Sequence, residues 1–134
     1  MNSFQGNIVD IKTSGNLSLV SVELESQQLI QSIIIETPKT AAYLKNGGPI
    51  QVLFKETEVV IATEKLKTIS LQNQIAANVS QVDSGELLSK VVLNSELGPL
   101  VSVISTRAVE QLNLAAGVSV FAMIKLNEVM LSSK

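Results

Sequence analysis

Short runs of alternating apolar and polar residues fill much of the chain. They predict β-strands, because successive side chains of a strand point to opposite faces of a sheet. Two of the clearest runs are residues 18–24 and 88–93, and each follows a turn that contains glycine. Val and Ile are abundant and favour strands over helices. The pattern therefore predicts a protein built mainly from short strands joined by turns.

The same pattern of strands occurs twice along the chain. Residues 47–61 read GGPIQVLFKETEVVI and residues 117–131 read GVSVFAMIKLNEVML. Aligned without a gap, the two segments share the first glycine, a lysine eight residues later, and Glu-Val followed by two apolar residues. The offset from Gly47 to Gly117 is 70 residues. An internal repeat of this length indicates two copies of one small module.

We expect a short helix between the third and fourth strands of each half. In the second half it should span residues 107–114, with Ser105 or Thr106 as the N-cap. In the first half Pro38 stands where the first helical position tolerates proline, after Thr37 as a plausible cap, and a Gly-rich turn ends the helix.

Five short strands with a helix between the third and fourth is the order of an OB-type barrel. We therefore predict an all-β fold of two tandem OB-type five-stranded barrels, one over residues 1–63 and one over residues 69–134. Residues 64–68 are the expected linker. Barrels this small bury little surface alone, so we expect them to share an interface.

Composition excludes several classes of function. The chain has no cysteine and no histidine, and so lacks the thiolate and imidazole groups that most zinc sites and many catalytic sites use. We therefore predict that it is not an enzyme and binds no bare metal cation. The net charge is −2 without a basic block, which disfavours nucleic acid as a partner. Because no stretch approaches about 18 apolar residues and the first residues do not form a secretory signal, we expect no membrane partner and a cytoplasmic location.

Two motifs in the second half resemble a known family. Residues 69–79 read ISLQNQIAANV and are similar to the opening strand of the Mop/TOBE family, Ile-Ser-Ala-Arg-Asn-x-Leu-x-Gly-x-Val. The matching residues are Ile69, Ser70, Asn73, Ile75 and Val79. Residues 122–131 read AMIKLNEVML and resemble the closing pattern, Ala-x-Ile-Lys-Ala-Thr/Ser-x-Val-Met-Leu. The closing motif is the more specific match, and the repeat extends the resemblance to the first half.

The resemblance implies binding of a tetrahedral oxyanion, molybdate or tungstate, with no organic cofactor. Paired modules of this kind resemble the molbindins, in which the anion is held between modules or subunits. We therefore expect a homo-oligomer, a trimer or a dimer of paired modules, that serves in storage, buffering or homeostasis. No DNA-binding region precedes the first module, so we expect a stand-alone binder. The alternative is a sensing, regulatory or structural oligomerisation module of a molybdate transport or regulatory system that has lost strong anion binding.

That alternative follows from departures from the family pattern. Leu71 replaces the family's alanine, Ala77 replaces its glycine, and Gln72 replaces its arginine, which removes one cationic contact from the opening strand. The first half lacks most of the opening motif and keeps only Asn2 opposite Asn73.

A tetrahedral dianion offers only hydrogen-bond acceptors, so a site for it must supply donors. The opening strand and the closing strand of the second half carry such donors, and the start of the helix adds free N–H groups. Lys55 and Thr37 are the counterparts in the first half. The full set of candidate ligand residues is Ser70, Leu71, Gln72, Asn73, Ser105, Thr106, Ala108, Lys125, Asn127, Thr37 and Lys55.

Each candidate also has a plainer explanation. Lys55 and Lys125 are ordinary surface lysines unless the repeat gives them a common role, and Ser70 and Asn73 could satisfy a strand end. A nucleic-acid-binding barrel is the rival from another class, but it needs aromatic stacking positions and a basic groove. The chain has only four aromatic residues, three Phe and one Tyr, which counts against that rival.

Overall fold

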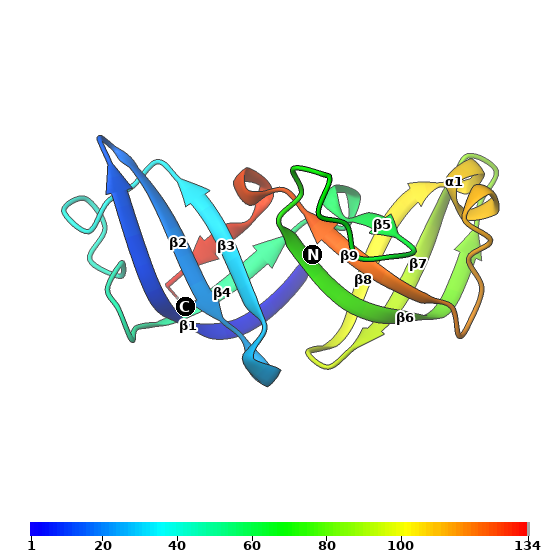
Figure 1. The fold of residues 1–134 in the computed structure, drawn as a ribbon, viewed down its shortest axis with the longest axis horizontal. Coiled ribbons are helices and arrows are strands. Elements are labelled where there is room, and N and C mark those ends of the chain that lie inside the picture. The colour runs from blue at the N-terminus through cyan, green and yellow to red at the C-terminus, as the bar shows by residue number, and fades with distance from the viewer. Residues whose placement is uncertain (134) are drawn as a thin grey trace.

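The computed structural model describes residues 1–133. Lys134, the last residue of the second expected module, lies outside the described residues. The chain forms two five-stranded antiparallel sheets, which lie side by side along the long axis of the molecule (Figure 1). Within the described residues, no helix is both long enough and apolar enough to span a membrane.

The first sheet has the strand order β10-β4-β1-β2-β3, and the second has the order β5-β9-β6-β7-β8. The strands of the first half are β1 (Asn2–Ser14), β2 (Leu17–Glu23), β3 (Leu29–Ile34), β4 (Pro49–Phe54) and β5 (Val60–Ala62). Those of the second half are β6 (Asn73–Ser84), β7 (Leu88–Ser95), β8 (Gly98–Ser105), β9 (Ser119–Ile124) and β10 (Met130–Ser132). Three short 3-10 helices, η1 (Glu25–Gln27), η2 (Glu56–Glu58) and η3 (Leu126–Glu128), and one α-helix, α1 (Thr106–Gln111), join them.

The repeat found in the sequence is confirmed in the backbone. Gly47 and Gly117 both adopt positive φ, of 82° and 96°, which a side chain disfavours. The N–H of Gly47 donates to the carbonyl of Ile8 at 2.7 Å, and the N–H of Gly117 donates to the carbonyl of Val79 at 2.8 Å. The strand register shifts directly after Ile8 in β1 and directly after Val79 in β6. The two glycines therefore close the same turn onto the same bulge in each half.

The two halves exchange their last strands. β5 follows β4 in the chain but pairs with β9, and β10 follows β9 but pairs with β4. The registers are equivalent, with Met130 opposite Leu53 and Val60 opposite Met123. Each sheet therefore contains four strands of one half and one strand of the other. The division of the chain at residues 64–68 remains a prediction, whereas the sheets themselves combine strands from both sides of it.

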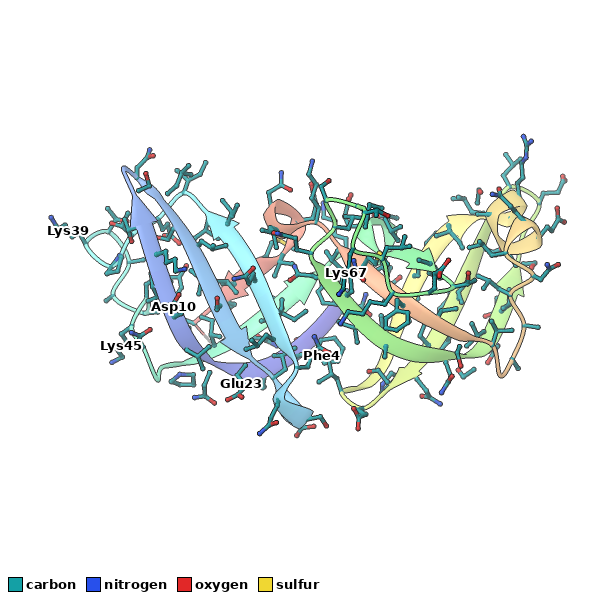
Figure 2. All side chains as sticks on the ribbon, viewed as in Figure 1. Phe4, Asp10, Glu23, Lys39, Lys45 and Lys67 are labelled. Atoms are coloured by element: carbon teal, nitrogen blue, oxygen red, sulfur yellow. The ribbon has the colours of Figure 1, made fainter. Side chains whose placement is uncertain are left out.

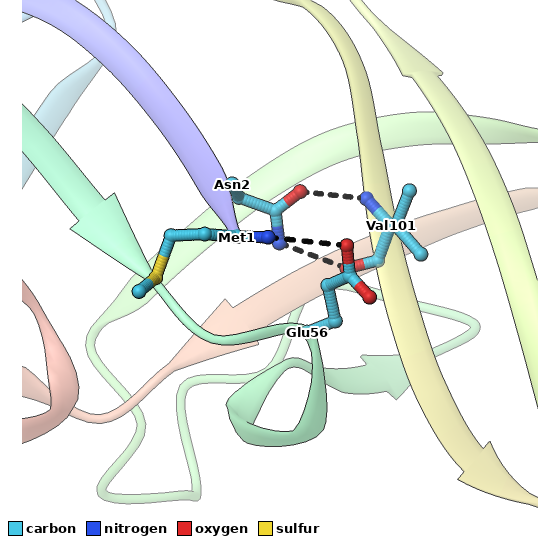
Figure 3. A network of polar contacts seen from close by, with 4 residues as sticks. All are labelled: Met1, Asn2, Glu56 and Val101. Carbon is cyan, nitrogen blue, oxygen red and sulfur yellow. Dashed lines mark hydrogen bonds and ion pairs between the residues drawn. The ribbon is translucent and has the colours of Figure 1, made fainter.

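Two buried asparagines join the halves in the same way. The side chain of Asn2 accepts from the N–H of Val101 and donates to its carbonyl, both at 2.8 Å (Figure 3). The side chain of Asn73 makes the same pair of bonds to Gln31, both at 2.9 Å. Asn2 is 6% exposed and Asn73 is 3% exposed. Each amide satisfies backbone groups at the outer edge of β8 or β3, where the sheet offers no neighbouring strand.

Two buried serines add a second matched pair of contacts. Ser32 donates to the carbonyl of Val129 at 2.6 Å, and Ser102 donates to the carbonyl of Val59 at 2.8 Å. Val59 and Val129 lie where the chain crosses from one half to the other, just before β5 and β10. The interface between the halves is therefore pseudo-twofold, polar at these points and fully hydrogen-bonded there.

The helix expected in the second half is confirmed, with different bounds. Ser105 is the N-cap, and its hydroxyl accepts from the N–H of Ala108 at 3.0 Å. The helix stops earlier than expected, because Asn113 adopts a φ of 53°. Asn113 and Leu114 then donate to the carbonyls of Glu110 and Val109, which is the Schellman arrangement.

The helix expected in the first half is wrong. Residues 38–47 form turns instead. The N–H of Ala41 donates to the carbonyl of Thr37, four residues earlier, but the N–H of Leu44 donates to the carbonyl of Ala41, only three residues earlier. Hydroxyl groups explain part of the difference. The Thr40 hydroxyl accepts from the N–H of Thr37, and the Thr37 hydroxyl accepts from the N–H of Lys39. These local bonds compete with the helix, and a segment this short does not recover the cost of nucleation.

The core is aliphatic, as the composition predicts. Its buried Ile, Val and Leu residues come from both halves and form one cluster. Phe54 is fully buried and stacks on Phe4, with the ring centroids 6.0 Å apart. The shared core explains why neither half needs to enclose a large core by itself.

Candidate anion-binding site

The segment before β6 was expected to be part of the opening strand, and this is wrong. β6 begins at Asn73, so Ser70, Leu71 and Gln72 lie in an irregular segment. The pairing of β6 with β9 stops there, because β9 ends at Ile124, opposite Asn73. Ser70 and Gln72 are exposed and Leu71 is half-buried. Their backbone groups are therefore outside the sheet, where they can face a ligand.

Gln74 holds this segment in place. Its side-chain amide donates to the carbonyl of Leu66 at 2.8 Å and to the carbonyl of Leu71 at 2.7 Å. The N–H of Leu66 donates back to the Gln74 side chain at 3.2 Å. The crossing loop, residues 63–72, is thus folded over the start of β6.

This loop brings in two cations that the sequence reasoning treated only as linker. Lys65 and Lys67 flank Leu66, and both are exposed. Figure 2 shows Lys67 near the middle of the molecule, whereas Lys39 and Lys45 lie at the outer end of the first module. The signal in the sequence was the pair of lysines two residues apart, directly before the Ser70 motif. They belong to the same loop as Gln72, which replaces the family's arginine.

Asn73 has a structural role in this chain. Both ends of its amide bond the backbone of Gln31, and the side chain is buried. Its role as a ligand stays a prediction, and a ligand would have to compete with these two bonds.

Lys125 lies next to the start of β6. It follows Ile124, which is opposite Asn73, and it is exposed at the N-cap of η3. Lys55 occupies the equivalent place at the N-cap of η2, with nearly the same backbone angles. It borders a hollow of about 260 Å³ together with Met1, Glu56 and Thr57. The α-amino group of Met1 forms an ion pair with the Glu56 carboxylate at 3.3 Å (Figure 3). A carboxylate therefore lies beside Lys55, but it is already paired.

Asn127 lies on a groove of about 670 Å³ between the end of β3 and the strand β10. The strand exchange puts it there, because η3 carries the chain from the second sheet to the first. Glu36 and Tyr43 line the same groove, and the other lining residues are aliphatic. Thr37 follows Glu36, but it is buried and its hydroxyl serves its own turn. This groove is therefore a poor place for an anion.

Tyr43, which lies on this groove, has a shifted pKa that a titration can measure. The Tyr43 hydroxyl donates to the Glu36 carboxylate at 2.5 Å. Burial first, then this hydrogen bond and the charge of Glu36, raise the pKa of Tyr43 from 10.0 to about 12. The neutral phenol is favoured in the folded state, so its contribution to stability is present below pH 10.0 and is lost as the pH rises toward 12.

We expect Glu36→Gln to lower the pKa of Tyr43, because it removes the negative charge beside the phenol. Since Tyr43 is the only tyrosine, absorbance of the tyrosinate reports this group alone. The chain unfolded in urea is the reference and should titrate near 10.0. A folded wild-type chain that titrates at the same pH as the unfolded one would contradict the contact.

Ser105, Thr106 and Ala108 lie far from Lys125. Ser105 is at the end of β8 next to α1, which lies at the outer end of the second module (Figure 1). The register places that end beside Ser84, whereas Lys125 is beside Asn73 at the other end of β6. The two ends are separated by roughly 35 Å of strand. One chain therefore does not bring the helix start and Lys125 to one site.

The polar groups at the helix start are also in use. The Thr106 hydroxyl donates to the carbonyl of Gly85 at 2.8 Å and lies 2.8 Å from the hydroxyl of Ser89. The Ser105 hydroxyl is occupied by the N–H of Ala108. Among residues 1–133 no group of three or more acidic side chains is placed to hold a metal ion.

Comparison with known proteins agrees with the resemblance seen in the sequence. The model of the TOBE domain matches residues 69–131. The molybdenum transport protein ModE of Herbaspirillum seropedicae is 30% identical over 133 residues, which are 98% of this chain and 49% of that protein. ModE of Azotobacter vinelandii is 25% identical over 132 residues, with the same two coverages. The chain thus spans about half the length of the curated relatives it matches.

The fold has a counterpart over its whole length. The crystal structure of the cytoplasmic molybdate-binding protein ModG with molybdate bound superposes with a TM-score of 0.90, at 22% identity, over 99% of this chain and 96% of that one. This likeness confirms the predicted all-β arrangement of two OB-like modules, apart from the first-half helix. The TOBE-domain match over residues 69–131 and the similarity to ModE agree with the resemblance to the Mop/TOBE family, and the ModG structure shows the same fold.

Proposed function

We propose that this chain binds a tetrahedral oxyanion, molybdate or tungstate, and that it is a binding protein rather than an enzyme. The observation that carries the proposal is the cluster of donors at the start of β6. Ser70 and the loop lysines Lys65 and Lys67 belong to the crossing loop, which Gln74 fastens to the start of β6. Lys125 directly follows Ile124, the residue opposite Asn73 at the same end of the strand. The match to proteins described as molybdate-binding or molybdenum transport proteins supports the choice of anion.

The chemistry suits a small dianion. Molybdate accepts hydrogen bonds and donates none, and the segment 69–72 offers hydroxyl, amide and backbone N–H donors outside the sheet. Exposed lysines beside it supply the compensating charge. Because these groups lie on an open surface, a partner module or subunit is needed to close the site and exclude water. We therefore place the site at contacts between modules or subunits of a homo-oligomer, a trimer or a dimer of paired modules.

The proposal extends to the biological role. We propose a cytoplasmic protein for storage, buffering or homeostasis of the oxyanion, with no organic cofactor and with no nucleic acid or membrane as partner. The second candidate is the ligand-sensing or regulatory module of a molybdate transport system. It is favoured by the length of the relatives, in which the matched region is 49% of the protein.

A calorimetric titration tests the proposal. We expect heat of binding with molybdate and with tungstate, and none with an equal concentration of sulfate. Lys125→Ala should weaken binding about tenfold, because it removes a charge beside the anion. Lys55→Ala is the matched control and should have a smaller effect, since Lys55 belongs to the first half, which lacks the Ser70 motif, and lies beside Glu56.

Absence of binding for all three anions, on folded protein of known oligomeric state, would refute the function and leave the fold intact. Equal and negligible effects of the two lysine substitutions would remove both side chains from the site.

A further inference from the structure

One side chain closes part of the crossing loop at its base. The Gln74 amide donates to the carbonyls of Leu66 and Leu71, at 2.8 and 2.7 Å, and its oxygen accepts from the N–H of Leu66 at 3.2 Å. The segment between the two leucines therefore leaves the surface and returns to the same point, as in a small Ω-loop. We name residues 66–71 the pinched loop.

The pinched loop is seated on the outer face of the second sheet. Gln74 is opposite Met123, so both side chains lie on the same face of that sheet. Met123 is 0% exposed, yet it is not part of the core cluster, to which its neighbours Ala122 and Ile124 belong. It is therefore covered on the outer face. Because β9 lies between β5 and β6, the connection from β5 to β6 must pass it, and Gln74 fastens that connection on this side (Figure 1).

The first sheet has no such seat. Ser3 takes the place of Gln74 in the repeat, directly after the interface asparagine, and its hydroxyl accepts from the Gln51 amide. Ser3 is opposite Leu53, the counterpart of Met123, and Leu53 is half-exposed rather than covered. The pinched loop and its fastening are therefore a feature of the second sheet, although the strands beneath are repeated.

The residues inside the pinched loop offer donors and no carboxylate. Lys67, Thr68, Ile69 and Ser70 lie between the two leucines, and all four are exposed. Their polar groups are one ammonium and two hydroxyls. Within residues 1–133 none of these polar side chains has a hydrogen-bond or ion-pair partner. The loop therefore presents donors to an acceptor from outside the chain.

Gln74 also fixes the direction of two backbone donors. In a planar trans peptide the N–H points away from the carbonyl of the preceding residue. The bonds from Gln74 to the carbonyls of Leu66 and Leu71 therefore turn the N–H groups of Lys67 and Gln72 away from the Gln74 amide. Among the described residues neither N–H donates to another acceptor. Backbone N–H groups held in this way suit an anion.

We propose that the pinched loop is a preformed anion-binding element, in which Thr68 and the N–H of Lys67 bind the anion beside Ser70 and Gln74 positions them. The inference rests on the proposed function, because it adds residues to the same site. A loop that is already closed at its base loses less conformational entropy when it binds. Lys67 also supplies a cation in the segment where Gln72 replaces the family's arginine.

Gln74→Met tests the positioning role, because it keeps the length of the side chain and removes all three bonds. Without anion, we expect the N–H of Leu66 to exchange faster with deuterium. Molybdate should bind about tenfold more weakly, and it should shift the NMR signals of the Lys67 and Gln72 amides in the wild type but not in the variant. Gln81→Met is the matched control on the same strand, since the Gln81 side chain is exposed and bonds only Asp83.

Thr68→Val tests the loop as a ligand, because it removes one hydroxyl and keeps the shape of the side chain. We expect molybdate to bind about tenfold more weakly while the urea midpoint stays unchanged. Thr57→Val is the matched control, since Thr57 is exposed in the first half. If the wild type binds molybdate and both Gln74→Met and Thr68→Val bind it equally well, the pinched loop is not part of the site and the proposed function stands. A wild type that binds none of the oxyanions would overturn both.

Discussion

Removal of residues 130–134 is expected to destabilise the first sheet, although these residues belong to the second half of the chain. β10 pairs with β4 through Met130, Leu131 and Ser132. Its loss leaves the outer edge of β4 without a partner and uncovers the apolar residues beneath Leu131. We expect the free energy of unfolding to fall by about 3–5 kcal/mol, from several lost ladder bonds and the lost burial.

Hydrogen exchange shows where the damage occurs. Protection should be lost in β4 and retained in β9, because β9 keeps both β5 and β6 as neighbours. Removal of residues 133–134 alone is the control and should leave the urea midpoint unchanged, since β10 ends at Ser132. Loss of protection in β9 with β4 unaffected would show that each half keeps its own last strand.

Asn73→Ala should be one of the two most damaging single substitutions at the interface between the halves. It removes two hydrogen bonds and leaves the N–H and the carbonyl of Gln31 without their partners at a part-buried position. Each unsatisfied group costs about 1–3 kcal/mol, so we expect a loss of about 2–4 kcal/mol in urea unfolding. Asn2→Ala should behave alike, because Asn2 makes the same two bonds to Val101.

Asn94→Ala is the matched control, because Asn94 is exposed on β7. We expect that substitution to change the free energy of unfolding by less than about 0.5 kcal/mol. If Asn73→Ala unfolds at the wild-type urea concentration but loses anion affinity, Asn73 is a ligand and does not stabilise the interface between the halves.

The repeat could be predicted because local backbone requirements leave marks in the sequence. Gly47 and Gly117 mark a turn that needs positive φ, and Ser105 marks a helix start that needs a side-chain acceptor. The first-half helix failed for a local reason as well. Thr37 and Thr40 bond their own backbone, and the short segment then has too few helical bonds left to propagate.

The strand exchange could not be predicted, and the repeat itself is the reason. Val60 and Met130 are equivalent residues, and so are Leu53 and Met123, which they face across the exchange. Because the registers are equivalent, a last strand that fits the sheet of the other half would also fit the sheet of its own half. Which pairing forms depends on the path of the chain through η2 and η3, and alternation of side chains carries no information about that path.

Part of the candidate site was misplaced because residues of one module need not lie at the same end of its sheet. The sequence grouped Lys125 with Ser105, because both belong to the second half. In the structure Lys125 lies where the chain leaves the second sheet, and Ser105 lies at the outer end of that module. Lys65 and Lys67 were missed for a related reason, since only the bonds of Gln74 show that the loop folds back over β6.

The central claim is that an oxyanion is held beside the start of β6, where modules or subunits meet. Diffraction from crystals soaked with tungstate, recorded at the tungsten absorption edge, locates the anion without prior assumptions. We predict an anomalous peak within hydrogen-bonding reach of Ser70 or Lys125, at a contact with another module or chain. A peak enclosed within a single barrel, or no peak in crystals that diffract well, would contradict the account.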